Sequence, residues 1–382
     1  MSSTVRASVL HGEKDLRVES RELPAPGPAE IQLAVKATGL CGSDLHYFLH
    51  NRVGDIVVKE PMSLGHESAG IVTAVGADVQ GDGPRQFQVG DHVAVEVGVP
   101  CEACDLCTAG RYNVCPDMRF RSSARTTPHV QGTLQERINH PAKWCYKLPA
   151  HVPLEYGALA EPLSVAMHAQ ARAGVTGGTV LILGAGTVGL LCAAVSRASG
   201  ATSIVMADIL EDRIAFARQN GFADAGIVVP RTNPNSLDEK LASAKSLART
   251  LTAAQANGHA NDEFHVVYEC TGVESCVQTA IYATRPGGKV LTIGMGNPVQ
   301  TVPIGTASKR EVDLIGVNRY ANTYPEVLRM LSEKSGKGVV PDIGKLVTQR
   351  FKGLDEVPNA FATASKVKDD QGNLVIKVMV EL

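Results

Sequence analysis

The pattern of apolar residues changes character at about Thr179. From there, six short and mostly continuous apolar runs alternate with polar or helix-like segments: TVLIL, TSIVMAD, AGIVVP, FHVVYECTG, KVLTIGM and VDLIGV. Runs of this kind are typical of strands that are buried on both faces of a parallel sheet. The pattern therefore predicts a doubly wound α/β domain.

The sequence before residue 155 has a different pattern. Its short β-like stretches, such as EIQLAVKATG, AGIVTAVG and DHVAVEV, are separated by glycine and proline. This favours an irregular, mostly antiparallel β domain. We expect the final stretch, LVIKVMVEL, to return to that first domain as a strand. Residues 231–262 predict an amphipathic helix inside an enlarged crossover of the α/β domain.

Composition and charge narrow the class of protein. The chain has 382 residues, enough for two domains, and its net charge of -2 lacks the basic excess of nucleic-acid-binding proteins. No run approaches the roughly 18 apolar residues of a membrane span, and the N-terminus lacks the apolar core of a signal peptide. We therefore expect a cytoplasmic protein without nucleic acid or membrane partners. Its nine cysteines then indicate metal binding or reactivity rather than disulfides.

The motif GAGTVG follows the strand-like TVLIL and precedes a helix-like segment. In a dinucleotide-binding turn, Gly184 makes the tight turn, Gly186 lets the backbone approach the pyrophosphate, and Gly189 packs the helix against the strand. The next predicted strand ends on Asp208, where a carboxylate would bind the adenosine ribose hydroxyls and repel a 2'-phosphate. The motif therefore predicts a site for NAD rather than NADP.

Four cysteines stand close together in the first domain, in the spacing C-x2-C-x2-C-x7-C: Cys101, Cys104, Cys107 and Cys115. Four thiolates can form the closed tetrahedral shell of a structural zinc site. An iron–sulfur cluster is the competing interpretation, because its cysteine spacings are similar.

A second set of metal-ligand types is scattered along the chain. Cys41, the pair His66 and Glu67, and Glu161 supply a thiolate, an imidazole and carboxylates, which are the donors of an open catalytic zinc site. Each residue alone also has an ordinary structural explanation, as a small apolar side chain, a core histidine or a helix N-terminal charge.

The order of these motifs resembles that of the zinc-containing medium-chain dehydrogenases, and within them the polyol dehydrogenases. The stretches that carry the resemblance are GLCGSDLHYF, GHESAGIV, VGDHVAVE, the four-cysteine segment, GRYNVC, LAEPLSVAMHA, GAGTVG and RYANTYPEVL. The resemblance implies a GroES-like, mostly antiparallel β catalytic domain over residues 1–158, a Rossmann domain over 159–310, and a return to the catalytic domain over 311–382. It also implies a homotetramer.

The resemblance assigns roles to the residues that match the family. Cys41 and His66 would hold the catalytic zinc, with Glu67 and Glu161 as the other candidate ligands, one of them acting through a water molecule. Ser43 and His46 would relay the substrate proton, unless Glu161 takes it. The residues expected to contact the substrate are Tyr47, Ile56, Phe120, Arg319 and Tyr320. The residues expected to contact the cofactor, besides the three glycines and Asp208, are Val188, Arg213, Ile293, Gly294, Met295 and Asn318.

The implied function is the zinc- and NAD-dependent oxidation of a sugar alcohol to a ketose, with D-sorbitol or L-iditol favoured. Xylitol or L-arabinitol is the alternative substrate, and threonine or a diol is a less favoured one. Ile56 and the segment 118–137 differ from the typical pattern of the family, so we expect these positions to determine the substrate. A non-catalytic NAD-sensing protein is the rival from another class, but it would be expected to lose several of these residues.

Overall fold

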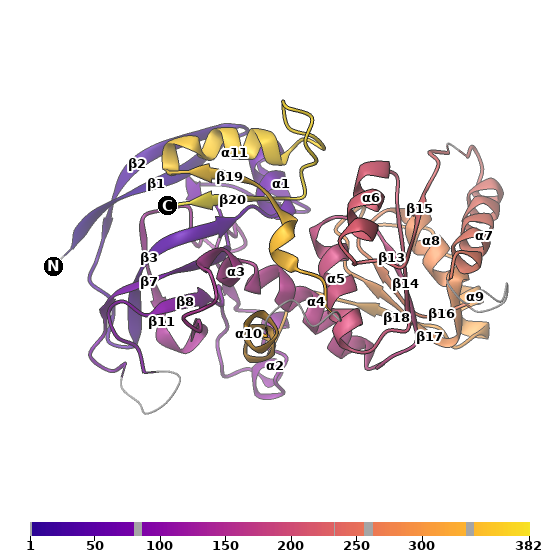
Figure 1. The fold of residues 1–382 in the computed structure, drawn as a ribbon. Helices are drawn as coiled ribbons and strands as arrows, with labels where there is room; N and C mark the ends of the chain where they lie inside the picture. Colours follow the sequence, from indigo (N-terminus) through magenta and orange to yellow (C-terminus); the bar gives the residue numbers. More distant parts are fainter. Residues whose placement is uncertain (1, 80–85, 233, 256–262, 334–339) are drawn as a thin grey trace. The chain divides into compact units, whose positions relative to one another are not determined.

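The computed structural model describes residues 2–79, 86–232, 234–255, 263–333 and 340–382 (Figure 1). The chain divides into two compact units. The first comprises the chain up to Glu161, Ala321–Glu333 and Gly344–Leu382, and the second comprises Pro162–Tyr320 and a short stretch that ends at Ile343. Residues 311–320 thus group with the second unit, whereas we expected the Rossmann domain to end at 310.

A seven-stranded sheet forms the centre of the first unit. Its strands follow the order β12-β8-β7-β3-β20-β19, and β11 also pairs with β3. All pairs are antiparallel except β19 with β20. The strands are β3 (Glu30–Gly39), β7 (Glu67–Val75), β8 (His92–Val95), β11 (Arg137–Pro141), β12 (Cys145–Lys147), β19 (Val347–Lys352) and β20 (Lys377–Glu381). Because β20 lies between β3 and β19, the predicted return of the C-terminal strand to the first domain is confirmed.

Smaller elements complete the first unit. A three-stranded sheet has the order β2-β1-β6, and two further strand pairs are β4-β5 and β10-β9. Their bounds are β1 (Ser3–Gly12), β2 (Asp15–Leu23), β4 (Arg52–Val53), β5 (Ile56–Val57), β6 (Met62–Ser63), β9 (Gly98–Val99) and β10 (Arg119–Phe120). The helices are α1 (Gly42–His50), α2 (Asp105–Thr108), α3 (Leu154–Ala158), α10 (Tyr324–Ser332) and α11 (Val357–Ala364). Helices α1 and α11 pack through Phe48 and Phe361, whose rings lie 5.0 Å apart in the core.

The second unit is built on a six-stranded parallel sheet. Its order is β15-β14-β13-β16-β17-β18, so the chain starts in the middle, moves to one edge and then to the other. The strands are β13 (Thr179–Leu183), β14 (Ser203–Asp208), β15 (Ala225–Val228), β16 (Phe264–Glu269), β17 (Thr284–Thr292) and β18 (Asp313–Gly316). Every adjacent pair is parallel. The doubly wound α/β domain predicted from the six apolar runs is therefore confirmed.

Helices cover both faces of this sheet. Helices α5 and α6 lie on one face, and α7 and α8 lie on the other (Figure 1). The helices of the unit are α4 (Ala160–Ala173), α5 (Thr187–Ala198), α6 (Glu211–Gln219), α7 (Leu237–Ala253), α8 (Glu274–Ala283) and α9 (Ile304–Lys309). Helix α7 confirms the helix predicted in the crossover, and residues 233 and 256–262 of that segment lie outside the described residues. Within the described ranges, no helix combines the length and the apolar character needed to cross a membrane.

Candidate active site and metal centres

Three strand ends of the first unit meet at one edge of its large sheet. The antiparallel register of β3 and β7 places Gly39, at the end of β3, opposite Glu67, at the start of β7. In the antiparallel pair of β3 and β20, Gly39 lies opposite Met379. Because both neighbours run opposite to β3, the residues just after β3 and those at the start of β7 and β20 meet at one place. Cys41, His66 and Lys377 stand at these strand ends.

Donor atoms of Cys41, His66 and Glu67 all lie within 4.8 Å of one another. His66 and Glu67 are buried, and Cys41 is partly buried. A thiolate, an imidazole and a carboxylate that converge from one side fit a zinc ion with an open position. Gly39 leaves room for this arrangement, because a Cβ atom there would collide with the Glu67 carboxylate. The residues therefore fit the catalytic zinc that the sequence predicts.

Asp44 lies next to His66, a contact that the sequence analysis did not identify. Its carboxylate is fully buried and accepts hydrogen bonds from Gly65 N at 3.0 Å and Ser122 Oγ at 2.6 Å. His66 Nδ1 lies 3.3 Å from Asp44 Oδ1, although the angle is not that of a hydrogen bond. Burial acts to raise the Asp44 pKa, but His66 and these donors bring it below its ordinary value. A carboxylate facing Nδ1 leaves Nε2 as the nitrogen for a metal.

Lys377 is the second residue that sequence reasoning missed. Its Nζ lies 2.7 and 2.8 Å from the two Glu67 carboxylate oxygens and donates a hydrogen bond to Leu40 O at 3.0 Å. Both charged side chains are buried, with 4% and 1% of their surface exposed. Burial alone would lower the Lys377 pKa, but Glu67, Cys41 and Glu161 together raise it. The lysine in the middle of the apolar run LVIKVMVEL, four residues before Glu381, is the available signal in the sequence.

Two other predicted residues border this cluster. Glu161 is buried near the start of α4, and it is close enough to Lys377 to raise the lysine pKa. The Phe120 ring is buried, and its centre lies 5.5 Å from that of the His66 ring. The site therefore has an apolar wall on the imidazole side and a second carboxylate near the lysine.

The remaining predicted residues of the first unit lie on or next to α1. Tyr47 is buried in the apolar core, and its hydroxyl accepts a hydrogen bond from Ala124 N at 3.3 Å. Ile56 packs against the same core. His46 lies exposed on the outer side of α1, with its ring 5.9 Å from that of His50, and Ser43 is partly buried. The described geometry thus groups Cys41, His66, Glu67 and Phe120 closely, and it leaves His46 facing solvent.

The four cysteines predicted to bind metal also converge. Their sulfur atoms form a compact group, with separations of 3.5 Å for Cys104–Cys107 and Cys101–Cys115, and 3.9 Å for Cys101–Cys107 and Cys104–Cys115. A tetrahedral zinc site with Zn–S bonds of about 2.3 Å requires sulfur separations of about 3.8 Å. Backbone N–H groups of Ala103 and Cys104 lower the pKa of Cys101 to about 7, which favours its thiolate form. The geometry fits a single zinc ion that is closed to substrate.

Buried and partly buried hydrogen bonds attach the four-cysteine segment to the rest of the first unit. Tyr112, which precedes Cys115, donates a hydrogen bond from its hydroxyl to Glu96 Oε1 at 2.7 Å. Tyr146 donates to the other Glu96 oxygen at 2.9 Å. Asn322 N in turn donates to the Tyr112 hydroxyl at 2.7 Å. Residues that lie outside the four-cysteine segment in the sequence therefore fix its position.

In the second unit, the glycine turn has the geometry that its sequence predicts. Gly184 has φ +100°, which few residues other than glycine adopt. A Cβ on Gly189 would collide with Gly184 O, so the start of α5 packs directly on the turn. The Asp208 carboxylate accepts hydrogen bonds from Ala185 N at 2.7 Å and from Leu210 N at 2.9 Å. Strand β14 and the turn are thereby fixed to each other.

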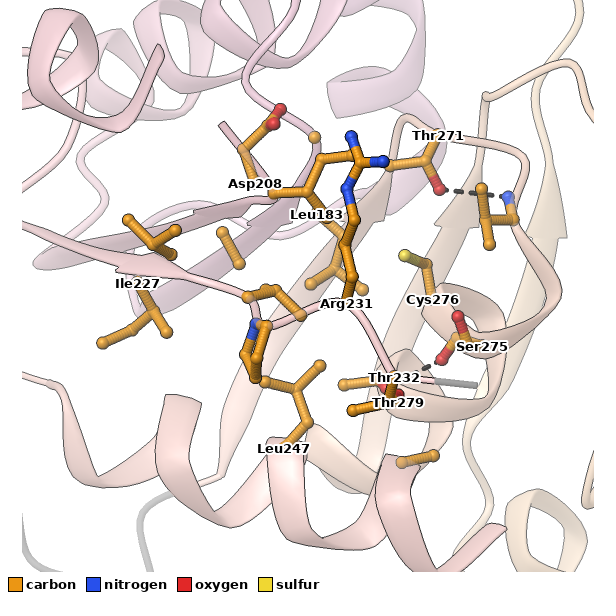
Figure 2. A pocket seen from close by; sticks show the side chains of 18 of the residues that line it. Leu183, Asp208, Ile227, Arg231, Thr232, Leu247, Thr271, Ser275, Cys276 and Thr279 are labelled. Atoms are coloured by element: carbon orange, nitrogen blue, oxygen red, sulfur yellow. Dashed lines mark hydrogen bonds between the residues drawn. The ribbon is translucent and has the colours of Figure 1, made fainter. Parts of the chain in front are cut away.

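A pocket of about 1220 Å³ opens beside this turn, at the ends of β14 and β15 and between α7 and α8. Figure 2 shows Asp208 on one side of the pocket and Thr271 and Cys276 on the other. Gly184, Gly186, Asp208 and Arg213 all line it, so these four predicted cofactor residues share one cavity. Arg213 lies 3.9 Å from Asp208. The site is at the carboxyl ends of parallel strands, where doubly wound sheets bind nucleotides.

The other predicted residues of the second unit are placed as follows. Val188 is partly buried in the first turn of α5. The backbone N–H groups of Ile293 and Gly294 donate to Glu269 O at 2.9 and 3.0 Å, and Met295 is 59% exposed. Asn318 is exposed, Arg319 has φ +51°, and Tyr320 is buried. None of these residues is among those that line the pocket beside the glycine turn.

Comparisons with known proteins support both halves of this description. Residues 27–150 match the alcohol dehydrogenase GroES-like domain, and residues 187–333 match the zinc-binding dehydrogenase domain. A sorbitol dehydrogenase from Bos taurus is 41% identical over 98% of this chain and 95% of its own length. An L-idonate 5-dehydrogenase from Vitis vinifera is 39% identical over 98% of this chain and 94% of its own length.

A solved structure shows the same fold. It is that of L-idonate 5-dehydrogenase from Escherichia coli, which is 27% identical, with a TM-score of 0.81 over 100% of this chain and 99% of its own. The predicted GroES-like and Rossmann fold class is thereby confirmed. With near-full-length relatives at about 40% identity, the chain belongs to the polyol dehydrogenase branch of the zinc-containing medium-chain dehydrogenases.

Proposed function

We propose that this chain oxidises a sugar alcohol to the corresponding ketose, with NAD as the hydride acceptor, and that D-sorbitol or L-iditol is the favoured substrate. Xylitol or L-arabinitol is the alternative within the same class. The proposal rests on the similarity to a sorbitol dehydrogenase over nearly the whole chain, together with the donor set at the first site. Threonine or a diol remains the less favoured choice.

One observation carries the proposal: the donor atoms of Cys41, His66 and Glu67 converge within 4.8 Å. A zinc ion held there would act as a Lewis acid that lowers the pKa of a substrate hydroxyl. Asp44 would keep the His66 ring in the orientation that presents Nε2. Phe120, next to that ring, would exclude water on one side and contact the carbon chain of the substrate.

The two carboxylates of the site, Glu67 and Glu161, would have different roles. Glu67 faces the buried Lys377, so its negative charge is stabilised whether or not it contacts the metal. Glu161 is buried near the same lysine and is the second carboxylate of the site, which suits a group that binds water or accepts a proton. Ser43 and His46 provide the second route for the proton, and the exposed position of His46 suits transfer to solvent.

At the second site, bound NAD would accept the hydride that leaves the substrate carbon. We propose that Asp208 binds the adenosine ribose and that Gly184, Gly186 and Gly189 admit the pyrophosphate. Val188, Arg213, Ile293, Gly294, Met295 and Asn318 are the further cofactor contacts proposed. Tyr47, Ile56, Arg319 and Tyr320 complete the proposed substrate contacts.

The test is the initial rate of NAD reduction with D-sorbitol, xylitol, L-arabinitol, galactitol, L-idonate, threonine and butanediol, each with and without a zinc chelator. We expect rapid, chelator-sensitive turnover of at least one alditol. Cys41→Ser should abolish turnover, because it removes the thiolate. Cys145→Ala is the matched control. Cys145 is a buried cysteine that belongs to neither metal-ligand cluster, so this variant should keep the activity.

Two results would contradict this proposal. Turnover of threonine or butanediol, with none of any alditol, would retain the site but change the substrate class. Full turnover and full zinc content in Cys41→Ser would show that the converging donors are not the catalytic centre.

We further propose that the protein is a cytoplasmic homotetramer that acts in carbohydrate metabolism. Large apolar side chains are exposed on the second unit, namely Val299 at 86%, Ile304 at 58% and Leu314 at 37%. Leu314 lies on β18, which ends the six-stranded sheet in the described part of the chain, and such an edge can pair with another copy. All nine cysteines are free, as suits a reducing compartment. Light scattering on the purified protein, together with Leu314→Lys, tests the assembly.

A further inference from the structure

The pocket beside the glycine turn contains a charged residue that the cofactor assignment does not use. Arg231 follows β15 and lines the pocket together with Asp208 and Arg213. Figure 2 shows its side chain extended into the cavity, with the guanidinium group directed toward the side where Asp208 and Thr271 lie. The charge therefore stands where the adenosine half of a dinucleotide would enter.

The other charged residues that line the pocket, Asp208 and Arg213, form an ion pair with each other. The Asp208 carboxylate accepts two backbone N–H groups and has Arg213 within 3.9 Å. Arg231, in contrast, makes no hydrogen bond or ion pair with any of the residues that the structure describes. An arginine that extends into a cavity without a protein partner is available for a ligand.

The walls of the same pocket indicate what kind of group that ligand presents. Three large apolar side chains that line it are unusually exposed: Ile209 at 49%, Val228 at 44% and Val273 at 51%. Exposed apolar side chains around a pocket favour a flat, weakly polar group. A guanidinium group stacks well on the face of an aromatic ring.

We infer that Arg231 is a cofactor-binding residue whose guanidinium group lies against the adenine ring of NAD. This inference rests on the proposed binding of NAD in this pocket. A phosphate on the ribose is the alternative anchor for a free arginine. However, Asp208 is held rigidly by two backbone donors, and its fixed negative charge would repel a phosphate bound to the neighbouring ribose. The adenine base is therefore the favoured partner.

The experiment measures how two nucleotides that differ only by a 2'-phosphate bind to the full chain. The dissociation constants of AMP and of adenosine 2',5'-bisphosphate are determined by calorimetry for the wild type, Arg231→Ala and Arg231→Lys. Arg249→Ala is the matched control, because Arg249 is an exposed arginine of α7 that does not line the pocket. Thermal unfolding of each variant checks that the fold is retained.

If Arg231 binds the base, Arg231→Ala raises the dissociation constants of both nucleotides by the same factor, about fivefold for a partly desolvated stacking contact. Arg231→Lys restores only part of the loss, because it keeps the charge without the planar group. The KM for NAD rises by the same factor while kcat is unchanged, and Arg249→Ala behaves as the wild type.

Two results would overturn the inference. If Arg231→Ala weakened the binding of the bisphosphate alone, Arg231 would bind the phosphate. If it changed the binding of neither nucleotide, Arg231 would not belong to the nucleotide site. Failure of the proposed function is a separate result. In that case the wild type would still bind AMP, and Arg231→Ala would still weaken AMP binding, although no alditol is oxidised.

Discussion

The buried pair of Lys377 and Glu67 gives a prediction that links stability to the metal. In Lys377→Met, the side chain keeps most of its length but loses its charge. Glu67 then remains buried without its cation, at 1% exposure, and the Leu40 carbonyl loses the hydrogen bond it received at 3.0 Å. We expect this variant to be strongly destabilised when no metal is bound.

The magnitude follows from the burial of both groups. Removal of one partner of a buried ion pair costs about 3–5 kcal/mol, because the remaining charge is left uncompensated. For a unit of roughly 200 residues, each kcal/mol lowers the unfolding temperature by about 2–4 °C. The expected decrease in chelator-treated protein is therefore about 6–20 °C. A zinc ion bound by Glu67 supplies a replacement cation, so the decrease should be smaller in zinc-loaded protein.

Differential scanning calorimetry with and without chelator measures both quantities. Lys352→Met is the matched control, because Lys352 is 84% exposed and lies 3.8 Å from Glu381, a surface pair worth about 0–1 kcal/mol. The double variant Glu67→Gln/Lys377→Met should recover much of the stability, since it leaves no unpaired charge. Two results would refute the energetic coupling of Lys377 and Glu67: Lys377→Met that is no more destabilising than Lys352→Met, or a double variant that recovers no stability.

Three further predictions address the metal centres and the cofactor. Asp44→Asn should weaken zinc binding at the catalytic site by about 10–100-fold in chelator competition, because the ring it orients is a proposed ligand; unchanged affinity would reject this role. Cys107→Ser should lower the zinc content by about one ion per chain in elemental analysis. An absorption spectrum of the wild type that shows an iron–sulfur cluster would instead mean that the four cysteines bind iron. Asp208→Ser with Ile209→Arg should shift the ratio of kcat/KM toward NADP by about tenfold or more, since a repulsive carboxylate is replaced by a phosphate partner. Activity with NAD should also fall in this variant, because Asp208 binds the backbone of the glycine turn through Ala185; an unchanged ratio would contradict the assignment.

The sequence by itself was sufficient where the chemistry is local. The six apolar runs became the six strands of one parallel sheet, because continuous apolar runs can only be buried on both faces. The turn at Gly184 and the four-cysteine segment are short, so their residue spacing alone already predicts a dinucleotide-binding turn and a four-cysteine metal site. The resemblance to a known family then supplied the pairing of distant residues that spacing could not.

The tertiary structure alone decided which distant side chains support the catalytic centre. Lys377 stands more than 300 residues from Glu67 in the chain, and only the pairing of β20 and β7 with β3 brings them within 2.7 Å. Asp44 lies in the first turn of α1, and the fold places its carboxylate 3.3 Å from His66 Nδ1. The physical reason is that strand register is set by the packing of the whole sheet, so no local pattern specifies which residues meet at its edge.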